Sequence, residues 1–130
     1  GAPDAYFASL PVNAMVAAMN QTEIPAAVSY TAGTYVCNDV MYQVLHALAT
    51  RFPETRGTFL HVPFATEQVV EKNAAAAEKA DAAEKTAAGE KTRQVPSMSL
   101  EMMTRGLQVA LEAALANDVD LADYESGTTC

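Results

Sequence analysis

The apolar positions along the chain predict three amphipathic helices, because they recur at steps of three and four residues. The first helix is expected over residues 12–20, the second from Val36 until Pro53 ends it, and the third from Leu100. Their apolar faces are, in order, Val12, Met15, Val16 and Met19; then Val36, Val40, Met41, Val44, Leu45, Leu48 and Phe52; then Leu100, Met103, Leu107, Ala110, Leu111 and Ala114. Ser97 or Ser99 can cap the third helix.

Two short stretches between these helices have the composition of strands. Residues 25–30 are small and apolar, and residues 57–62 are rich in residues that favour strands. A turn at Gly33 separates the first stretch from the second helix. The alternation of strand and helix indicates an α/β fold, with an open, mostly parallel sheet covered by helices on both faces in three layers. Two strands are too few for a stable sheet, so we expect an incomplete portion of a single domain over residues 1–130.

The composition changes over residues 71–94, which consist of alanine and Glu-Lys pairs with almost no large apolar side chain. Such a segment favours a solvated helix or disorder, and we interpret it as an insertion. The acidic tail over residues 118–130 is expected to be frayed, with Cys130 a bystander thiol.

Charge and cysteine content narrow the function classes. The net charge of −8 comes from 16 acidic and 8 basic residues, and no basic stripe is present. We therefore expect neither nucleic acid nor membrane as a partner. Two cysteines are too few for a disulfide scaffold, which favours the reducing cytoplasm. The cysteines and histidines lack the spacing of zinc ligands, so no metal is expected.

Cys37 is the candidate nucleophile. It follows a predicted strand and the turn at Gly33, and it lies in the first turn of the second predicted helix. The partial positive charge and unsatisfied N–H groups of a helix N-terminus favour the reactive thiolate, and they supply candidate oxyanion donors. In open α/β sheets, ligands bind at this edge. Position alone supports packing equally well, because buried cysteine usually acts as a small hydrophobe.

His61 is the candidate base. It ends the second predicted strand, on the same sheet edge as Cys37 if the strands are parallel. An imidazole there can take the proton of the thiol and later protonate the leaving amine. A histidine satisfied in the core or at the surface is the alternative. His46, in the middle of a predicted helix, is interpreted as structural.

A family resemblance rests on four segments in order. The core Ser29-x-x-Ala32-Gly33-x-aromatic-Val36-Cys37-Asn38 resembles the active-site cysteine signature of the type I pyroglutamyl peptidases, also called pyrrolidone-carboxylate peptidases. The run His61-Val-Pro-Phe64 resembles the histidine motif of the same family, at a similar distance after the cysteine. Ala5-Tyr-Phe-Ala-Ser-Leu-Pro11 and Pro96-Ser-Met-Ser-Leu100 resemble two further segments. The resemblance covers about residues 1–68 and 95–116 and skips the alanine-rich stretch.

The resemblance implies an omega peptidase that removes N-terminal pyroglutamate from peptides. Cys37 would attack the carbonyl after pyroglutamate, and water would hydrolyse the acyl-enzyme, with His61 as base and then acid. Tyr35 and Val36 would help form the lactam pocket, although Tyr35 can equally be packing. The chemistry needs no cofactor, and the resemblance implies multimers.

The resemblance also implies that the acidic third member of the triad lies upstream of the matched region. Glu54 and Glu67 are the acids nearest to His61 in sequence, but no motif supports either, so we assign no acid. We expect a C-terminal portion that is weak or inactive until an N-terminal portion completes it. The alternatives are a non-catalytic fragment or interaction module that keeps the motif, and a different Cys–His amidase or acyl transferase. The core motif argues against the last.

Overall fold

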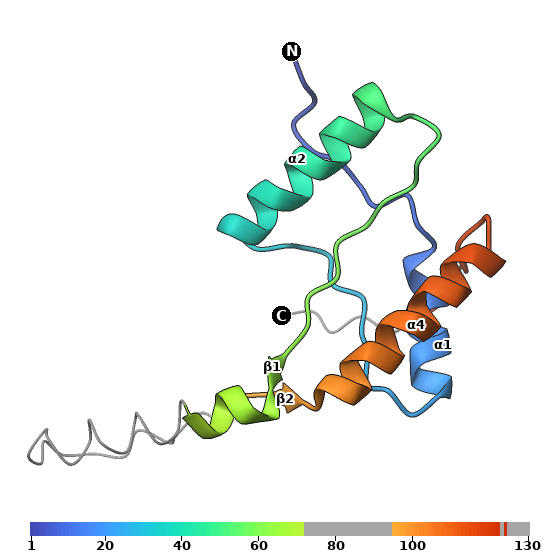
Figure 1. Ribbon diagram of the computed structural model, residues 1–130. Coiled ribbons are helices and arrows are strands. Elements are labelled where there is room, and N and C mark those ends of the chain that lie inside the picture. Colours follow the sequence, from blue (N-terminus) through green and yellow to red (C-terminus); the bar gives the residue numbers. More distant parts are fainter. Residues whose placement is uncertain (72–94, 123, 125–130) are drawn as a thin grey trace, which may run out of the picture. The chain divides into compact units, whose positions relative to one another are not determined.

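The computed structural model describes residues 1–71, 95–122 and 124 (Figure 1). The elements run in the order α1 (Val12–Gln21), α2 (Val36–Arg51), β1 (Phe64–Ala65), β2 (Ser97–Met98) and α4 (Leu100–Ala116), with a further helical stretch at residues 66–71. They belong to two compact units. The first comprises Gly1–Leu60 and Arg105–Cys130, and the second comprises His61–Thr104. Residues 72–94 of the predicted insertion over residues 71–94 lie outside the described residues, as do residues 123 and 125–130 of the predicted tail.

The three predicted helices are confirmed, within a residue or two at their ends. Ser99 caps α4, because its Oγ accepts the backbone N–H of Met102 at 3.2 Å. Pro53 follows the end of α2 closely, as expected for a residue that cannot continue a helix. Local sequence signals therefore set the helix boundaries.

The core of the first unit forms between α1 and the part of α4 after Arg105 (Figure 1). Met15, Val16 and Met19 of α1 pack with Ile24 against small residues of α4. The small buried residues of α4 are Gly106, Ala110, Ala113 and Ala114. A Cβ added at Gly106 would lie 3.3 Å from Ile24 Cγ2, so the Ile24 side chain would have to shift by a few tenths of an ångström to make room for it.

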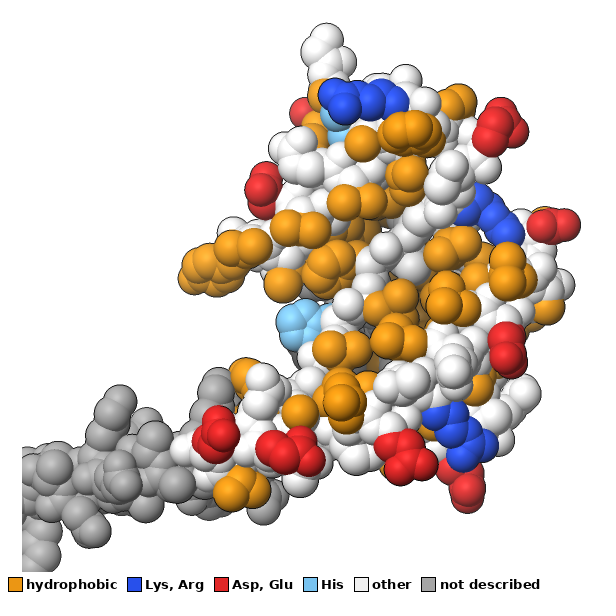
Figure 2. All heavy atoms as spheres, viewed as in Figure 1, with side chains coloured by type: hydrophobic (Ala, Val, Ile, Leu, Met, Phe, Trp, Pro, Cys, Tyr) orange, Lys and Arg blue, Asp and Glu red, His pale blue; other side chains and the backbone are white. Residues whose placement is uncertain are grey.

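The predicted apolar face of α4 is therefore not buried at its three leucines, because Leu100, Leu107 and Leu111 are exposed, whereas Met103 is half-buried. Leu115, outside the predicted face, is 83% exposed. The close approach of α1 selects the alanine and glycine face, because leucines would not fit between the helices. Figure 2 shows hydrophobic side chains exposed over α4 and over α2 on the visible face.

Both ends of α1 are closed by contacts from outside the helix or just beyond it. At its start, Asp120 accepts the backbone N–H groups of Asn13 and Ala14, at 3.1 and 3.0 Å. At its end, Ile24 N–H donates to the Met19 carbonyl and Glu23 N–H to the Asn20 carbonyl, at 3.0 and 3.2 Å. These two bonds form a Schellman motif, in which Glu23 takes the left-handed conformation with φ of 62°.

The C-terminal end of α4 is held by Arg56. Its guanidinium donates to the carbonyls of Ala114, Asn117 and Asp118, at 3.2, 3.1 and 3.4 Å. The fraying predicted for the tail over residues 118–130 stays a prediction, although Asp118 and Asp120 in its described part make hydrogen bonds. The N-terminus of α1 and the guanidinium of Arg56 each form hydrogen bonds with this segment, and its local sequence does not predict either contact.

The two predicted strands are also wrong as strands, because residues 25–30 and 57–62 form no strand in the structure. A strand is defined by its hydrogen bonds to a neighbouring strand, and that neighbour is not a local property of the sequence. The described strands are β1 and β2 in the second unit. They pair in parallel, with Phe64 opposite Ser97 and Ala65 opposite Met98.

In the second unit, Ala65 N–H donates to Gln68 Oε1 at 2.9 Å, which starts the helical stretch at residues 66–71 immediately after β1. Among the described residues, no helix is both long enough and apolar enough to cross a membrane.

Candidate functional site

Cys37 is the second residue of α2 and is half-buried in its first turn. Tyr35 is the N-cap residue in an extended conformation, and its carbonyl accepts the N–H groups of Asn38 and Asp39 at 3.0 and 3.2 Å. Those two N–H groups are engaged within the helix and do not point to a ligand. The predicted position of the nucleophile at the start of a helix is confirmed as a position, and its chemistry stays a prediction.

The turn that leads to Cys37 is built by side chains and one glycine. Ser29 Oγ donates to the Thr31 carbonyl at 2.8 Å, and Gly33 N–H donates to Thr31 Oγ1 at 3.0 Å. Gly33 has φ of 79°, a conformation that glycine adopts without steric cost. The predicted glycine turn is therefore present, and it changes the chain direction just before the cysteine.

The two candidate pocket residues flank the cysteine and are open to solvent. Tyr35 is 85% exposed and Val36 is 75% exposed. Val36 begins an apolar ridge on α2 that continues through Val40 and Val44, both also exposed. Since these side chains are spaced by four residues, they share one helix face. Their role in binding a lactam ring stays a prediction.

His61 is the first residue of the second unit, and its side chain is exposed. It lies three residues before β1, in a stretch that is neither helix nor strand. Cys37 belongs to the first unit. The pairing of thiol and imidazole therefore stays a prediction from the sequence. Glu54 is exposed in the first unit and Glu67 is exposed in the second, six residues after His61.

His46, which we interpreted as structural, lies in a cluster of aromatic rings on α2. Tyr6 Oη lies 2.7 Å from His46 Nδ1, and the rings of Tyr42 and His46 stack at 6.3 Å. Tyr42 also donates from its hydroxyl to the Pro3 carbonyl at 2.8 Å. Burial, and then the nearby Tyr42, raise the pKa of Tyr6 above its usual value. This cluster fastens the N-terminal segment to α2.

Sequence reasoning missed Tyr6 and Tyr42. A signal was present for Tyr42, because it precedes His46 by four residues and so shares its helix face. Tyr6 carried none, since its contact with His46 spans 40 residues.

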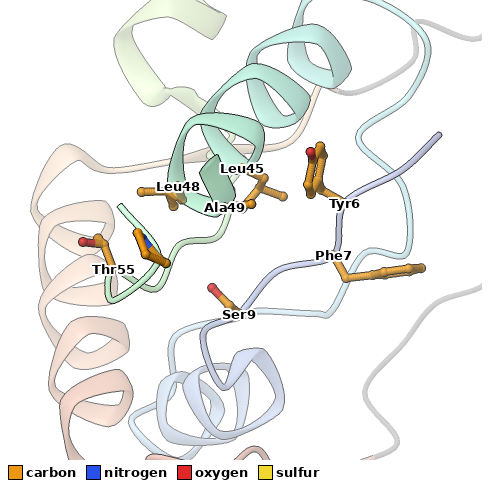
Figure 3. Close-up of a pocket in the computed structure, with 8 residues that line it drawn as sticks. Tyr6, Phe7, Ser9, Leu45, Leu48, Ala49 and Thr55 are labelled. Carbon is orange, nitrogen blue, oxygen red and sulfur yellow. The ribbon is translucent and has the colours of Figure 1, made fainter. Parts of the chain in front are cut away.

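A half-open hollow lies beside this cluster, between the second half of α2, the N-terminal segment and the loop after α2 (Figure 3). It is lined by Tyr6, Phe7, Ser9, Leu45, Leu48, Ala49, Pro53 and Thr55. Leu45 follows Cys37 by eight residues, which is about 12 Å along a helix. The hollow is therefore separate from the candidate nucleophile.

Comparison with known proteins identifies relatives of almost the whole chain. A model of the family described as pyroglutamyl peptidase matches residues 1–117. The pyrrolidone-carboxylate peptidase of Enterococcus faecalis is 42% identical over 125 residues, which is 96% of this chain and 49% of that protein. The enzyme of the same name from Thermococcus onnurineus is 44% identical over 115 residues, 88% of this chain and 47% of that protein.

Solved structures give the same result for the fold. Pyroglutamyl peptidase I from Bacillus amyloliquefaciens has a TM-score of 0.74 at 32% identity, over 95% of this chain and 49% of that chain. A mutant pyrrolidone carboxyl peptidase from Pyrococcus furiosus has a TM-score of 0.69 at 37% identity, over 89% and 48%. The predicted α/β class is confirmed, and the chain spans about half the length of these relatives.

Proposed function

This chain belongs to the pyroglutamyl peptidase family, and on that premise we propose that it carries Cys37 and His61 of a cysteine peptidase that removes N-terminal pyroglutamate from peptides. The observation that carries the proposal is the position of Cys37. It lies in the first turn of α2, immediately after the turn at Gly33, in a segment that the family model matches. Relatives over the same span are named pyrrolidone-carboxylate peptidases.

The proposed reaction has two steps. The Cys37 thiolate attacks the carbonyl carbon that joins pyroglutamate to the next residue, while His61 holds the thiol proton. The bond from that carbon to the amide nitrogen breaks, and His61 delivers the proton to the leaving amine. Water, deprotonated by His61, then cleaves the thioester and releases free pyroglutamate, which restores the thiol.

Tyr35 and Val36 are the proposed substrate contacts from this chain. Both side chains are exposed and adjoin Cys37 in sequence, so an incoming lactam ring can bury apolar surface against them. We place the reaction in the cytoplasm, because a reducing compartment keeps a nucleophilic thiol reduced.

We further propose that activity requires more polypeptide than this chain, either the remaining length of the family domain or further copies in a multimer. The chain spans about half the length of its relatives. Two apolar ridges in the first unit support the proposal. The first is Val36, Val40 and Val44 on α2, and the second is Leu107, Leu111 and Leu115 on α4. Exposed ridges of this kind are typical of surfaces that another polypeptide covers.

The test is release of a chromophore from a pyroglutamyl amide. The chain is assayed alone and mixed with the part of the Enterococcus faecalis relative that it does not match. We expect weak or no turnover alone and measurable turnover in the mixture. Cys37→Ser and His61→Ala should each abolish it. The matched controls are the other cysteine and the other histidine, so Cys130→Ser and His46→Gln should keep activity.

Full turnover by Cys37→Ser would disprove the nucleophile. Ordinary turnover by the chain alone would show that it contains the third acid, with Glu54 and Glu67 the first to substitute. A mixture that associates but never turns over would favour the non-catalytic interaction module.

A further inference from the structure

The side chain of Asn20, near the end of α1, binds both backbone groups of a single residue. Ala26 N–H donates to Asn20 Oδ1 at 3.0 Å, and Asn20 Nδ2 donates to the Ala26 carbonyl at 3.1 Å. Asn20 Nδ2 also donates its second hydrogen to the hydroxyl oxygen of Tyr124, at 3.2 Å. The carboxamide oxygen and both amide hydrogens of Asn20 thus each have a partner, which sets the orientation of the carboxamide.

This pairing repeats what a neighbouring strand does. In a sheet, one residue gives its N–H and its carbonyl to the same partner strand. The chain around Ala26 also has the alternation of a strand. Ile24 is buried and Ala26 and Val28 are half-buried, whereas the residues between them are exposed. Ile24, Ala26 and Val28 all pack in the α1–α4 core.

Alternation with a period of two makes register decisive. A slip by one residue would turn Ile24, Ala26 and Val28 outward and bring their exposed neighbours inward. Within the described part of this chain residues 25–30 form no strand, and the Asn20 carboxamide makes the corresponding pair of hydrogen bonds to Ala26.

The register at Ala26 bears on the position of Cys37, because the chain between them is short. From Val28 the chain passes through the side-chain turn of Ser29 and Thr31 and the left-handed Gly33 into α2. These links are short and lie in one compact unit with Asn20. We propose that Asn20 is a positioning residue that holds residues 25–35 in register and thereby sets the place of Cys37, with Tyr124 fixing the Asn20 amide.

This inference rests on the proposed function for its catalytic meaning, but its test does not. All variants carry Cys130→Ser, so that Cys37 is the reacting thiol. The first readout is the rate of Cys37 alkylation by iodoacetamide between pH 6 and 9. The second is hydrogen exchange of the backbone amides of residues 25–40, compared with those of α4.

Asn20→Ala should raise alkylation of the half-buried Cys37 and exchange over residues 25–40 by about fivefold, because lost hydrogen bonds raise the population of the locally open state. Exchange in α4 should stay unchanged. Asn20→Asp, which keeps the acceptor for Ala26 N–H and loses both Nδ2 contacts, should lie between. Gln21→Ala, the adjacent exposed helix residue, is the matched control and should leave both readouts unchanged.

Equal increases in hydrogen exchange over residues 25–40 and in α4 would show general destabilisation and overturn the inference. Unchanged exchange and alkylation in Asn20→Ala would also overturn it. If Asn20→Ala does not fold, Tyr124→Phe removes only the bond to Nδ2. Tyr124→Phe should then give a smaller increase in hydrogen exchange over residues 25–40. If that exchange did not increase, the inference would be overturned. In the complemented peptidase assay, Asn20→Ala should lower kcat with KM unchanged. The complemented parent could show no peptidase activity while Asn20→Ala still gave the expected increases in Cys37 alkylation and in exchange over residues 25–40. That result would refute the proposed function and leave the positioning role standing.

Discussion

The carboxylate of Asp120 caps α1 through the backbone N–H of Ala14, a contact of 3.0 Å between residues 106 positions apart. Pro11 occupies the N-cap position and makes no side-chain cap. Asp120 therefore does from a distance what a serine or aspartate normally does from within the helix. Its negative charge also lies at the positive end of the α1 dipole.

Removing this cap should destabilise the protein. Asp120→Ala is expected to lower the free energy of unfolding by about 1–2 kcal/mol, as loss of an N-cap does. Urea unfolding followed by circular dichroism measures it. Asp118→Ala is the matched control, because that side chain is 99% exposed and its ion pair with Arg56 is 3.8 Å long. Equal losses in both variants would contradict a specific cap.

The left-handed residue at the end of α1 predicts a stabilising substitution. Glu23 has φ of 62° at the position of the Schellman motif that glycine prefers. Glu23→Gly should raise the free energy of unfolding by about 0.5–1 kcal/mol, since the relief of strain exceeds the added entropy of the unfolded chain. Thermal unfolding measures the gain. Gln21→Gly, within the helix, should instead be destabilising. If Glu23→Gly lowered the free energy of unfolding, the backbone at Glu23 would not be strained.

The contacts of Arg56 predict that arginine and lysine at this position differ in the stability that they give the protein. Its fork reaches three carbonyls at the C-terminal end of α4. Arg56→Lys keeps the charge but cannot reproduce the planar fork, so it should still lose about 1 kcal/mol in the free energy of unfolding. Arg105→Lys, on an exposed position of α4, provides the control. If Arg56→Lys unfolds at the same urea concentration as the parent, the three contacts add no stability.

The raised pKa of Tyr6 predicts a loss of stability in alkali. The folded state keeps the Tyr6 proton at a pH where the unfolded state has begun to lose it. This contribution is fully present below the ordinary tyrosine pKa of 10.0 and disappears as pH rises through the higher pKa of the folded state. Unfolding measured from pH 8 to 11 should therefore show falling stability above about pH 10. Tyr6→Phe should flatten that decline, and an unchanged slope would contradict the assignment.

How much the sequence determined depends on the range of each interaction. The helices α1 and α2 followed from spacing and from Pro53, and the cap of α4 from Ser99, because these signals lie within a few residues of the structure that they specify. The motif around Cys37 and His61 is likewise local. It indicated the family, which the match over residues 1–117 confirmed.

Tertiary structure decided what depends on distant partners. Asp120 and Tyr124 act on α1 from the far end of the chain, and the sequence near them predicted only a frayed tail. The buried face of α4 is its small face, because α1 approaches too closely for leucines, and helical periodicity does not distinguish the two apolar faces. Residues 25–30 are the sharpest case. Their composition and alternation are those of a strand, but a strand needs a hydrogen-bonded neighbour that these residues do not encode. In the described part of this chain the contact to the backbone of Ala26 comes from the Asn20 side chain.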